Sequence, residues 1–224
     1  MEILLAYYSR NGHTARLTEA LTAELESRGH TIHTEAIRPV NMPNGSWSLL
    51  ARCLPGVPYI LFSCFVFPLR RYLQPEAKIA PLQYPDVSRF ERVVVGGPKW
   101  MHLSFPMARY VKQVNGLEGK KVAGYSSFCG SPEQKRFEMY AYFQPFNDLV
   151  RSAGGEVIAQ LGISSAHTDI RLLPTAWFKA ICRIRFRRPL SSYGLDSQWG
   201  RQQLEHFCDL IEKDKAERGD LPVP

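Results

Sequence analysis

Short apolar runs alternate along the chain with longer segments whose apolar residues recur at helical spacing. The runs span residues 2–8, 31–37, 91–97, 121–126 and 156–163. They have the length of buried strands, and residues 91–97 include three consecutive valines. The helical patterns fall at about 13–28, 105–114, 132–153 and 198–213. This alternation predicts right-handed βαβ crossovers, and so an α/β fold with a five-stranded parallel sheet and helices on both faces.

Two stretches, at about 43–88 and 164–196, interrupt this rhythm. The first separates the second and third predicted strands by more than fifty residues, where a compact α/β unit needs far fewer. Its most apolar part, residues 57–69, is too short to span a membrane and contains Pro58 and Pro68. Three interpretations stay open for it: an interfacial or partner-binding hairpin, a cover over a ligand site, or simple packing against the domain.

The composition is that of one packed globular unit. The chain has 224 residues, of which 45% are hydrophobic and 22% charged, and no repeat or linker divides it. We therefore expect a single domain, residues 1–224, with the two stretches as insertions. The five cysteines include no CxxC pair, and the first residues lack a basic signal-peptide segment. These features favour a reducing, cytoplasmic location and indicate no disulfide framework or zinc site.

The net charge of +7 is concentrated in the two insertions. Residues 43–75 contribute +3 and residues 165–195 contribute +5, so the remainder sums to −1. In residues 177–188 basic and apolar side chains alternate, which is typical of an interfacial patch. We expect attraction to an anionic membrane surface or a phosphorylated substrate, with peripheral association at the inner face of a membrane. No nucleic-acid-reading motif accompanies the charge.

A polar loop follows the first strand directly and carries the main candidate chemistry. It consists of Ser9, Arg10, Asn11, Gly12, His13 and Thr14. A loop between a strand and a helix can hold a phosphate with backbone N–H groups and the positive end of the helix dipole. Hydroxyl and amide side chains add hydrogen bonds, and Gly12 permits close backbone approach. The sequence is neither a Walker A loop nor a dinucleotide fingerprint, and an ordinary polar turn is the alternative.

With this loop the chain resembles the flavodoxin superfamily. The family's FMN phosphate loop reads T/S-x-T-G-x-T, and residues 9–14 are similar to it, with Asn11 in place of the central hydroxyl residue. The loop after the third strand is similar to the family's G-[ST]-P-x-aromatic loop, and the loop after the fourth to its Ser/Gly-rich loop. The resemblance implies a doubly wound sheet of order 2-1-3-4-5, with these loops together around FMN.

The resemblance also implies which further residues contact the flavin. They are Pro98, Lys99, Trp100, Met101 and His102 after the third strand, and Ser126, Ser127, Phe128, Cys129 and Gly130 after the fourth. Trp100 is expected against the isoalloxazine, or else packed beneath its loop. Lys99 is expected near flavin N1 or O2, or else solvated. No catalytic residue is assigned, because the cofactor itself performs the redox chemistry, and no metal-ligand spacing is present.

The preferred functional hypothesis is an FMN-dependent oxidoreductase that acts on a hydrophobic or membrane-derived acceptor such as a quinone. The basic insertions depart from carrier flavodoxins, which are typically acidic, and the chain is weakly similar to membrane-associated flavodoxin-like oxidases. Two alternatives remain: a flavodoxin-type electron carrier whose insertions dock a redox partner, and a flavin-free interaction module. The electron donor and the oligomeric state, a homodimer included, stay open.

Overall fold

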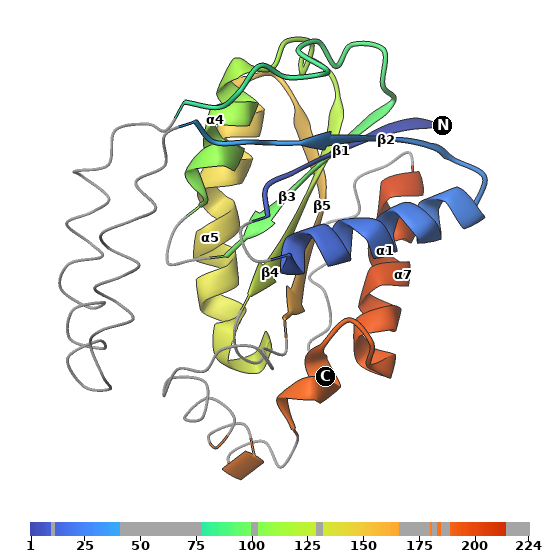
Figure 1. Ribbon diagram of the computed structural model, residues 1–224, viewed down its shortest axis with the longest axis vertical. Coiled ribbons are helices and arrows are strands. Elements are labelled where there is room, and N and C mark those ends of the chain that lie inside the picture. Colours follow the sequence, from blue (N-terminus) through green and yellow to red (C-terminus); the bar gives the residue numbers. More distant parts are fainter. Residues whose placement is uncertain are drawn as a thin grey trace, which may run out of the picture.

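Five parallel strands form one sheet in the order β2-β1-β3-β4-β5 (Figure 1). The computed structural model describes residues 1–9, 12–40, 78–99, 103–128, 132–165, 180, 183–184 and 189–213. The strands are β1 (Glu2–Tyr7), β2 (Thr31–Ala36), β3 (Arg92–Pro98), β4 (Lys121–Phe128) and β5 (Glu156–Ser164). This order confirms the one that the resemblance implies. Because β2 and β3 pair with opposite edges of β1, the topological switch point lies between β1 and β3.

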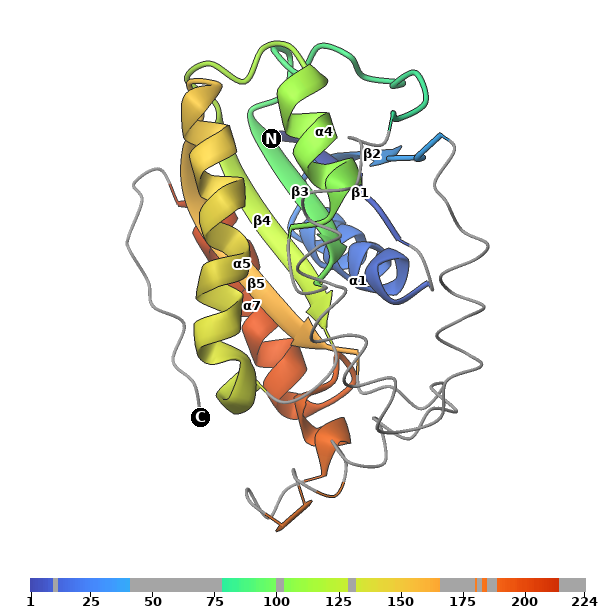
Figure 2. The same ribbon diagram turned by 90° about the vertical axis from the view of Figure 1, so that its left-hand side faces the viewer.

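Helices cover both faces of this sheet. One face carries α1 (His13–Ser27) and α7 (Gln198–Glu212), and the other carries α4 (Phe105–Gln113) and α5 (Pro132–Ser152). A short 3₁₀ helix, η1 (Leu190–Tyr193), precedes α7. Figure 2 shows α4 and α5 in front of the sheet and α1 and α7 behind it. The fold is therefore three-layered, as expected from the alternating pattern.

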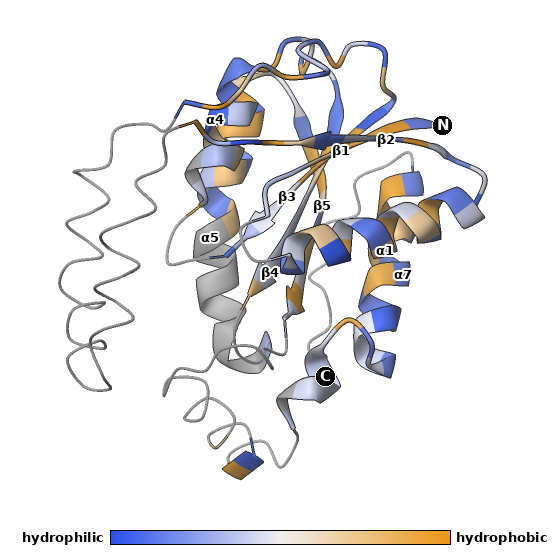
Figure 3. Ribbon diagram, viewed as in Figure 1, coloured by the Kyte–Doolittle hydropathy of each residue, from blue (hydrophilic) through white to orange (hydrophobic). Residues whose placement is uncertain are grey.

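The central strands β1 and β3 contribute alternate residues to two separate cores. On β1, Leu4 and Ala6 belong to the core beneath α4 and α5, whereas Ile3 and Leu5 belong to the core beneath α1 and α7. All four are fully buried. A strand buried on both faces has no polar side to present, which explains why β1 and β3 are apolar runs, whereas the edge strand β2 includes hydrophilic residues (Figure 3).

The predicted elements are confirmed, with most bounds shifted by only one or two residues. Strand β4 differs in a way that concerns the site, because it was expected to end at Ser126 and continues to Phe128. Its last residues extend the ladder with β5, where Ser127 pairs with Ile163 and Phe128 with Ser164. Ser126, Ser127 and Phe128 are therefore buried strand residues and not part of a loop.

The first insertion joins the domain through a short antiparallel pairing. Val40 donates a backbone hydrogen bond to Lys78 over 2.7 Å, and Ala80 donates one to Arg38 over 2.8 Å. The apolar run 57–69 and most of the basic segment 177–188 lie outside the described residues. Within the described ranges, no helix is both long enough and apolar enough to cross a bilayer.

Candidate functional site

Three connections meet at the carboxyl edge of the sheet, beside the switch point. Tyr8, just after β1, donates its backbone N–H to Gly96 of β3 over 2.9 Å. Lys99, just after β3, donates to the carbonyl of Ser127 on β4 over 2.8 Å. These bonds tie the exits of β1, β3 and β4 together, so residues far apart in sequence form one continuous edge. This is where open α/β sheets bind their ligands.

Helix α1 begins at this edge with Gly12 as its N-cap residue. Gly12 adopts a left-handed conformation with φ of 83°, which an L side chain rarely adopts, and its carbonyl accepts the first helical bond from Arg16. No side chain caps this end among the described residues, and the first turn contains no acidic residue. The positive end of the helix dipole at this edge therefore favours an anion.

Two hydroxyl oxygens near this edge are buried without a hydrogen-bond partner among the described residues. Ser9 Oγ follows β1 and Ser104 Oγ precedes α4. Ser104 Oγ lies beside Gly97, since a Cβ built on Gly97 would come within 2.9 Å of it. A buried hydroxyl without a partner costs about 1–3 kcal/mol. Both atoms thus have hydrogen-bonding capacity that a polar ligand could satisfy.

Thr14, in the first turn of α1, points toward the sheet. Its hydroxyl lies 2.8 Å from that of Ser127, and the two side chains are only 1% and 6% exposed. A hydroxyl group has one hydrogen and two lone pairs, so each member of the pair keeps capacity for a further bond. The predicted phosphate loop and the end of β4 are therefore in direct contact.

The other predicted cofactor contacts divide into two groups. His13 is the first residue of α1, Pro98 ends β3 and Lys99 follows it, and all three are half-buried at the same edge. The remaining predicted contacts lie outside the described residues: Arg10, Asn11, Trp100, Met101, His102, Cys129 and Gly130. Their roles toward the flavin stay predictions.

Sequence reasoning missed two residues that support this edge from below. Tyr125 on β4 is fully buried, and its hydroxyl lies 2.6 Å from that of Thr18 on α1. Thr18 in turn donates a hydrogen bond to the carbonyl of Thr14 over 2.8 Å. A signal was present in the sequence, since two threonines four residues apart share the apolar face of α1.

An exposed ion pair lies at the start of α1. Arg16 makes two hydrogen bonds to Asp196, of 2.7 and 2.9 Å, with both side chains largely exposed. This pair links the start of α1 to the loop before α7. Among the described residues, no group of three or more His, Cys, Asp or Glu side chains is arranged to hold a metal ion.

The chain matches no protein-family model and no curated protein sequence. Among solved structures, it is similar to the oxidised flavodoxin 2 of Bacillus cereus, with a TM-score of 0.50 and 13% identity. That match covers 94% of this chain and 97% of the flavodoxin. A flavoprotein of Lactobacillus acidophilus, solved in complex with FMN, matches with a TM-score of 0.49 and 16% identity over 72% and 92% of the two chains. The fold is flavodoxin-like.

Proposed function

We propose that this protein binds FMN at the carboxyl edge of its sheet and transfers electrons as a flavodoxin-type carrier. The observation that carries the proposal is the start of α1 behind Gly12, which no side chain caps within the described ranges, together with the hydroxyl group of Ser9 just after β1, which is buried and has no partner in those ranges. The phosphate group of FMN would accept hydrogen bonds from the helix N–H groups and from Ser9. The residues at the carboxyl ends of β3 and β4 would flank the flavin ring.

The residues present fit a mononucleotide better than a dinucleotide. Among the described residues, one helix start at this edge follows a left-handed glycine, and the sequence has no GxGxxG fingerprint for a second phosphate. FMN, when bound, supplies the electron-transfer chemistry, so the chain needs no nucleophile of its own. The task of these residues is to hold the phosphate, flank the ring and exclude water.

The carrier function is favoured by the architecture. The structural likeness to a Bacillus cereus flavodoxin extends over nearly the whole length of both chains. A second candidate is an FMN-dependent oxidoreductase acting on a hydrophobic acceptor such as a quinone. It is favoured by a specific feature of the sequence: the positive charge and the apolar run 57–69 lie in insertions and not in the sheet domain. Those insertions are also proposed to contact an anionic membrane surface.

Substitution of Ser9 tests the FMN site directly. In the apo protein, Ser9→Ala removes an unpartnered hydroxyl, so stability should stay the same or rise slightly. In the complex it removes a hydrogen bond to a charged group, worth about 1.5–3 kcal/mol, so FMN affinity should fall tenfold or more. Ser152→Ala, at the exposed end of α5, is the control for both measurements. Flavin absorbance of the purified parent protein gives the stoichiometry, and a parent without bound or bindable FMN would refute the proposal.

The two candidate activities are separated by steady-state kinetics. A carrier should accept electrons from a reductase and show little turnover with NAD(P)H and a quinone alone. An oxidoreductase should turn over under those conditions, and deletion of residues 57–69 should lower its rate. Sedimentation with anionic vesicles at low and high salt tests the membrane contact, which salt should weaken.

A further inference from the structure

Four buried hydroxyl groups connect α1 to β4 in two steps. Thr14 bonds Ser127 over 2.8 Å, and Thr18 bonds Tyr125 over 2.6 Å. The two threonines are one helical turn apart on α1, and their partners are two residues apart on the same face of β4. We call this set of four residues the hydroxyl ladder, and each of its two hydrogen-bonded pairs a rung. All four side chains are at most 6% exposed and are flanked by the apolar core of that face.

The hydrogen positions in one rung follow from its chemistry. Thr18 lies 2.8 Å from the carbonyl oxygen of Thr14, and a carbonyl oxygen can only accept, so the single hydrogen of the Thr18 hydroxyl is used there. The hydroxyl of Tyr125 must therefore donate to Thr18. Burial raises the pKa of Tyr125, so it keeps the hydrogen that this bond requires. The bonds run from β4 through Thr18 to the backbone of the first turn of α1.

The spacing of the rungs matches on the two elements. Four residues of a helix advance by about 6 Å, and two residues of a parallel strand advance by about 6.6 Å. A slip of α1 along the sheet would break both rungs and leave the hydroxyl groups of Thr14, Tyr125 and Ser127 buried without partners, which is costly in an apolar core; Thr18 would keep its bond within the helix. The ladder therefore fixes the axial position of α1, whereas apolar packing alone tolerates small shifts.

Gly96 leaves the space that the ring of Tyr125 occupies. A Cβ built on Gly96 would lie between 2.0 and 2.4 Å from three atoms at the hydroxyl end of this ring. Gly96 is the register partner of Tyr125 on the neighbouring strand β3. The missing side chain at position 96 lets the ring lie flat on β3 and extend its hydroxyl group to Thr18. Glycine at position 96 therefore permits the hydrogen bond between Tyr125 and Thr18.

We propose that the hydroxyl ladder positions the first turn of α1 for the phosphate group of FMN, with Tyr125 and Thr18 as positioning residues that do not touch the cofactor. This inference rests on the proposed function. Residues 12–14 lie at the start of α1, which would bind the phosphate. The hydroxyl ladder connects this part of α1 to β4, and the carboxyl end of β4 would flank the flavin ring. The distance between the phosphate site and the ring site is then set by the ladder.

A comparison of FMN with riboflavin tests the inference, because riboflavin lacks the phosphate group. Tyr125→Phe keeps the ring over Gly96 and removes only the hydroxyl. It should lower FMN affinity about threefold to tenfold and riboflavin affinity less than twofold. Tyr110→Phe is the matched control, since Tyr110 is equally buried and its hydroxyl has no partner among the described residues. It should leave the ratio of the two affinities unchanged.

Two further measurements separate positioning from general stability. Thr18→Val should reproduce the loss of FMN preference, and Thr18→Ser, which retains the hydroxyl group, should restore it. Hydrogen exchange in the apo proteins should show faster exchange of the amides of residues 16–18 in Tyr125→Phe than in Tyr110→Phe.

The possible outcomes are distinct. An unchanged ratio of FMN to riboflavin affinity in Tyr125→Phe, in a parent that binds FMN, would overturn the inference alone. Equal amide exchange in the two tyrosine variants would also overturn it. A parent that binds neither flavin would overturn the proposed function, and the phosphate role of the ladder with it.

Discussion

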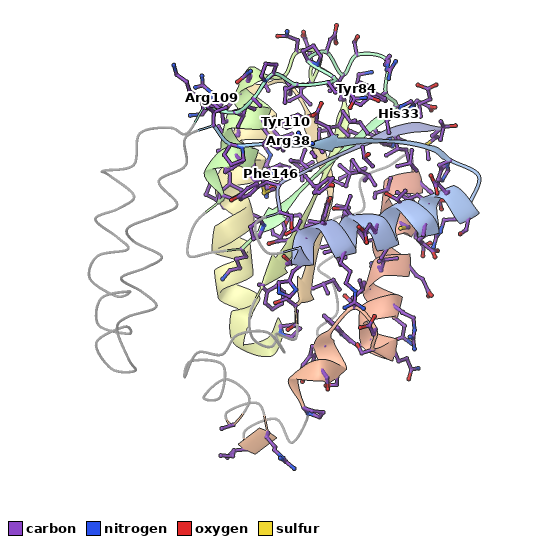
Figure 4. The ribbon with its side chains drawn as sticks, in the orientation of Figure 1. His33, Arg38, Tyr84, Arg109, Tyr110 and Phe146 are labelled. Carbon is purple, nitrogen blue, oxygen red and sulfur yellow. The ribbon has the colours of Figure 1, made fainter. Side chains whose placement is uncertain are left out.

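On the face covered by α1 and α7, two pairs of buried hydroxyl groups bond across the contact between helix and strand, whereas on the face covered by α4 and α5 the buried hydroxyl of Tyr110, like that of Thr22 on α1, has no partner among the described residues. Tyr110 and Phe146 lie on this second side of the sheet (Figure 4). Burial and the charge of Glu35 raise the pKa of Tyr110, so its hydroxyl stays protonated without bonding.

The difference shows what each face contributes. Hydrogen bonds have directions and lengths, so a contact that contains them fixes the register of a helix, whereas apolar packing is non-directional. The helix with the polar rungs is α1, whose start forms the proposed phosphate site. Helix α5 packs mainly through aromatic residues such as Phe143 and Phe146, whose rings meet edge to face at 6.4 Å between centroids. Its one part-buried side-chain bond to the sheet among the described residues runs from Gln160 of β5 to Asn147 over 2.6 Å, and lies away from the proposed phosphate site.

Substitution of one glycine on each face should produce the largest contrast. Gly96→Ala would place a Cβ about 2 Å from the Tyr125 ring, so the ring must move away from β3 and lose its hydrogen bond to Thr18. Gly124→Ala, on the other face, would meet Phe146 at 2.8 Å and Phe143 at 3.1 Å, which small ring movements relieve. We expect losses of unfolding free energy of about 3 kcal/mol or more for Gly96→Ala and about 1–2 kcal/mol for Gly124→Ala. Urea unfolding measures both losses, and equal losses would contradict the proposed role of Gly96 in accommodating the Tyr125 ring.

The two buried tyrosines allow a finer test with the same chemical change. Tyr125→Phe removes a hydroxyl that donates to Thr18 and should cost about 0.5–1.5 kcal/mol of unfolding free energy. Tyr110→Phe removes a hydroxyl without a partner among the described residues and should be neutral or stabilising. Thermal unfolding at pH 7 compares the two, and a larger loss for Tyr110→Phe would show that its hydroxyl has a partner after all.

The sequence was sufficient to predict the centre of the sheet because β1 and β3 are buried on both sides. Val93, Val94 and Val95 read as one apolar run whichever face each residue takes, so the strand is predictable without knowledge of the packing. The same property hides the partners of individual residues. The end of β4 was misjudged because Ser127 is polar, and its pairing with Pro98 of β3 and Ile163 of β5 keeps it within the strand.

The candidate site could be predicted as a location but not as a set of contacts. The position of residues 9–14 after β1 predicts that they lie at the carboxyl edge, and Gly12 precedes α1 there; its positive φ was not predicted. The bond between Thr18 and Tyr125 joins residues 107 positions apart, and nothing local in either segment specifies it. Such bonds depend on how α1 lies on the sheet, which is a tertiary property.

The smallest expected contrast lies within the α1 face itself, where ion pairs join both ends of α1 to α7 or the loop before it. At the helix end, Arg28 bonds Glu24, Asp209 and Glu212, and its side chain is 21% exposed. At the helix start, the Arg16 side chain bonds Asp196 and is 63% exposed.

Because a shielded network is less screened than an exposed pair, Arg28→Ala should lower the unfolding free energy by about 1 kcal/mol and Arg16→Ala by about 0.5 kcal/mol or less. Unfolding at low and at 1 M salt measures both. Salt should remove the effect of Arg16→Ala and leave most of that of Arg28→Ala. If Arg16→Ala proved the more damaging, the start of α1 would be held by its surface charge, and the ladder beneath it would not be the main determinant of its position.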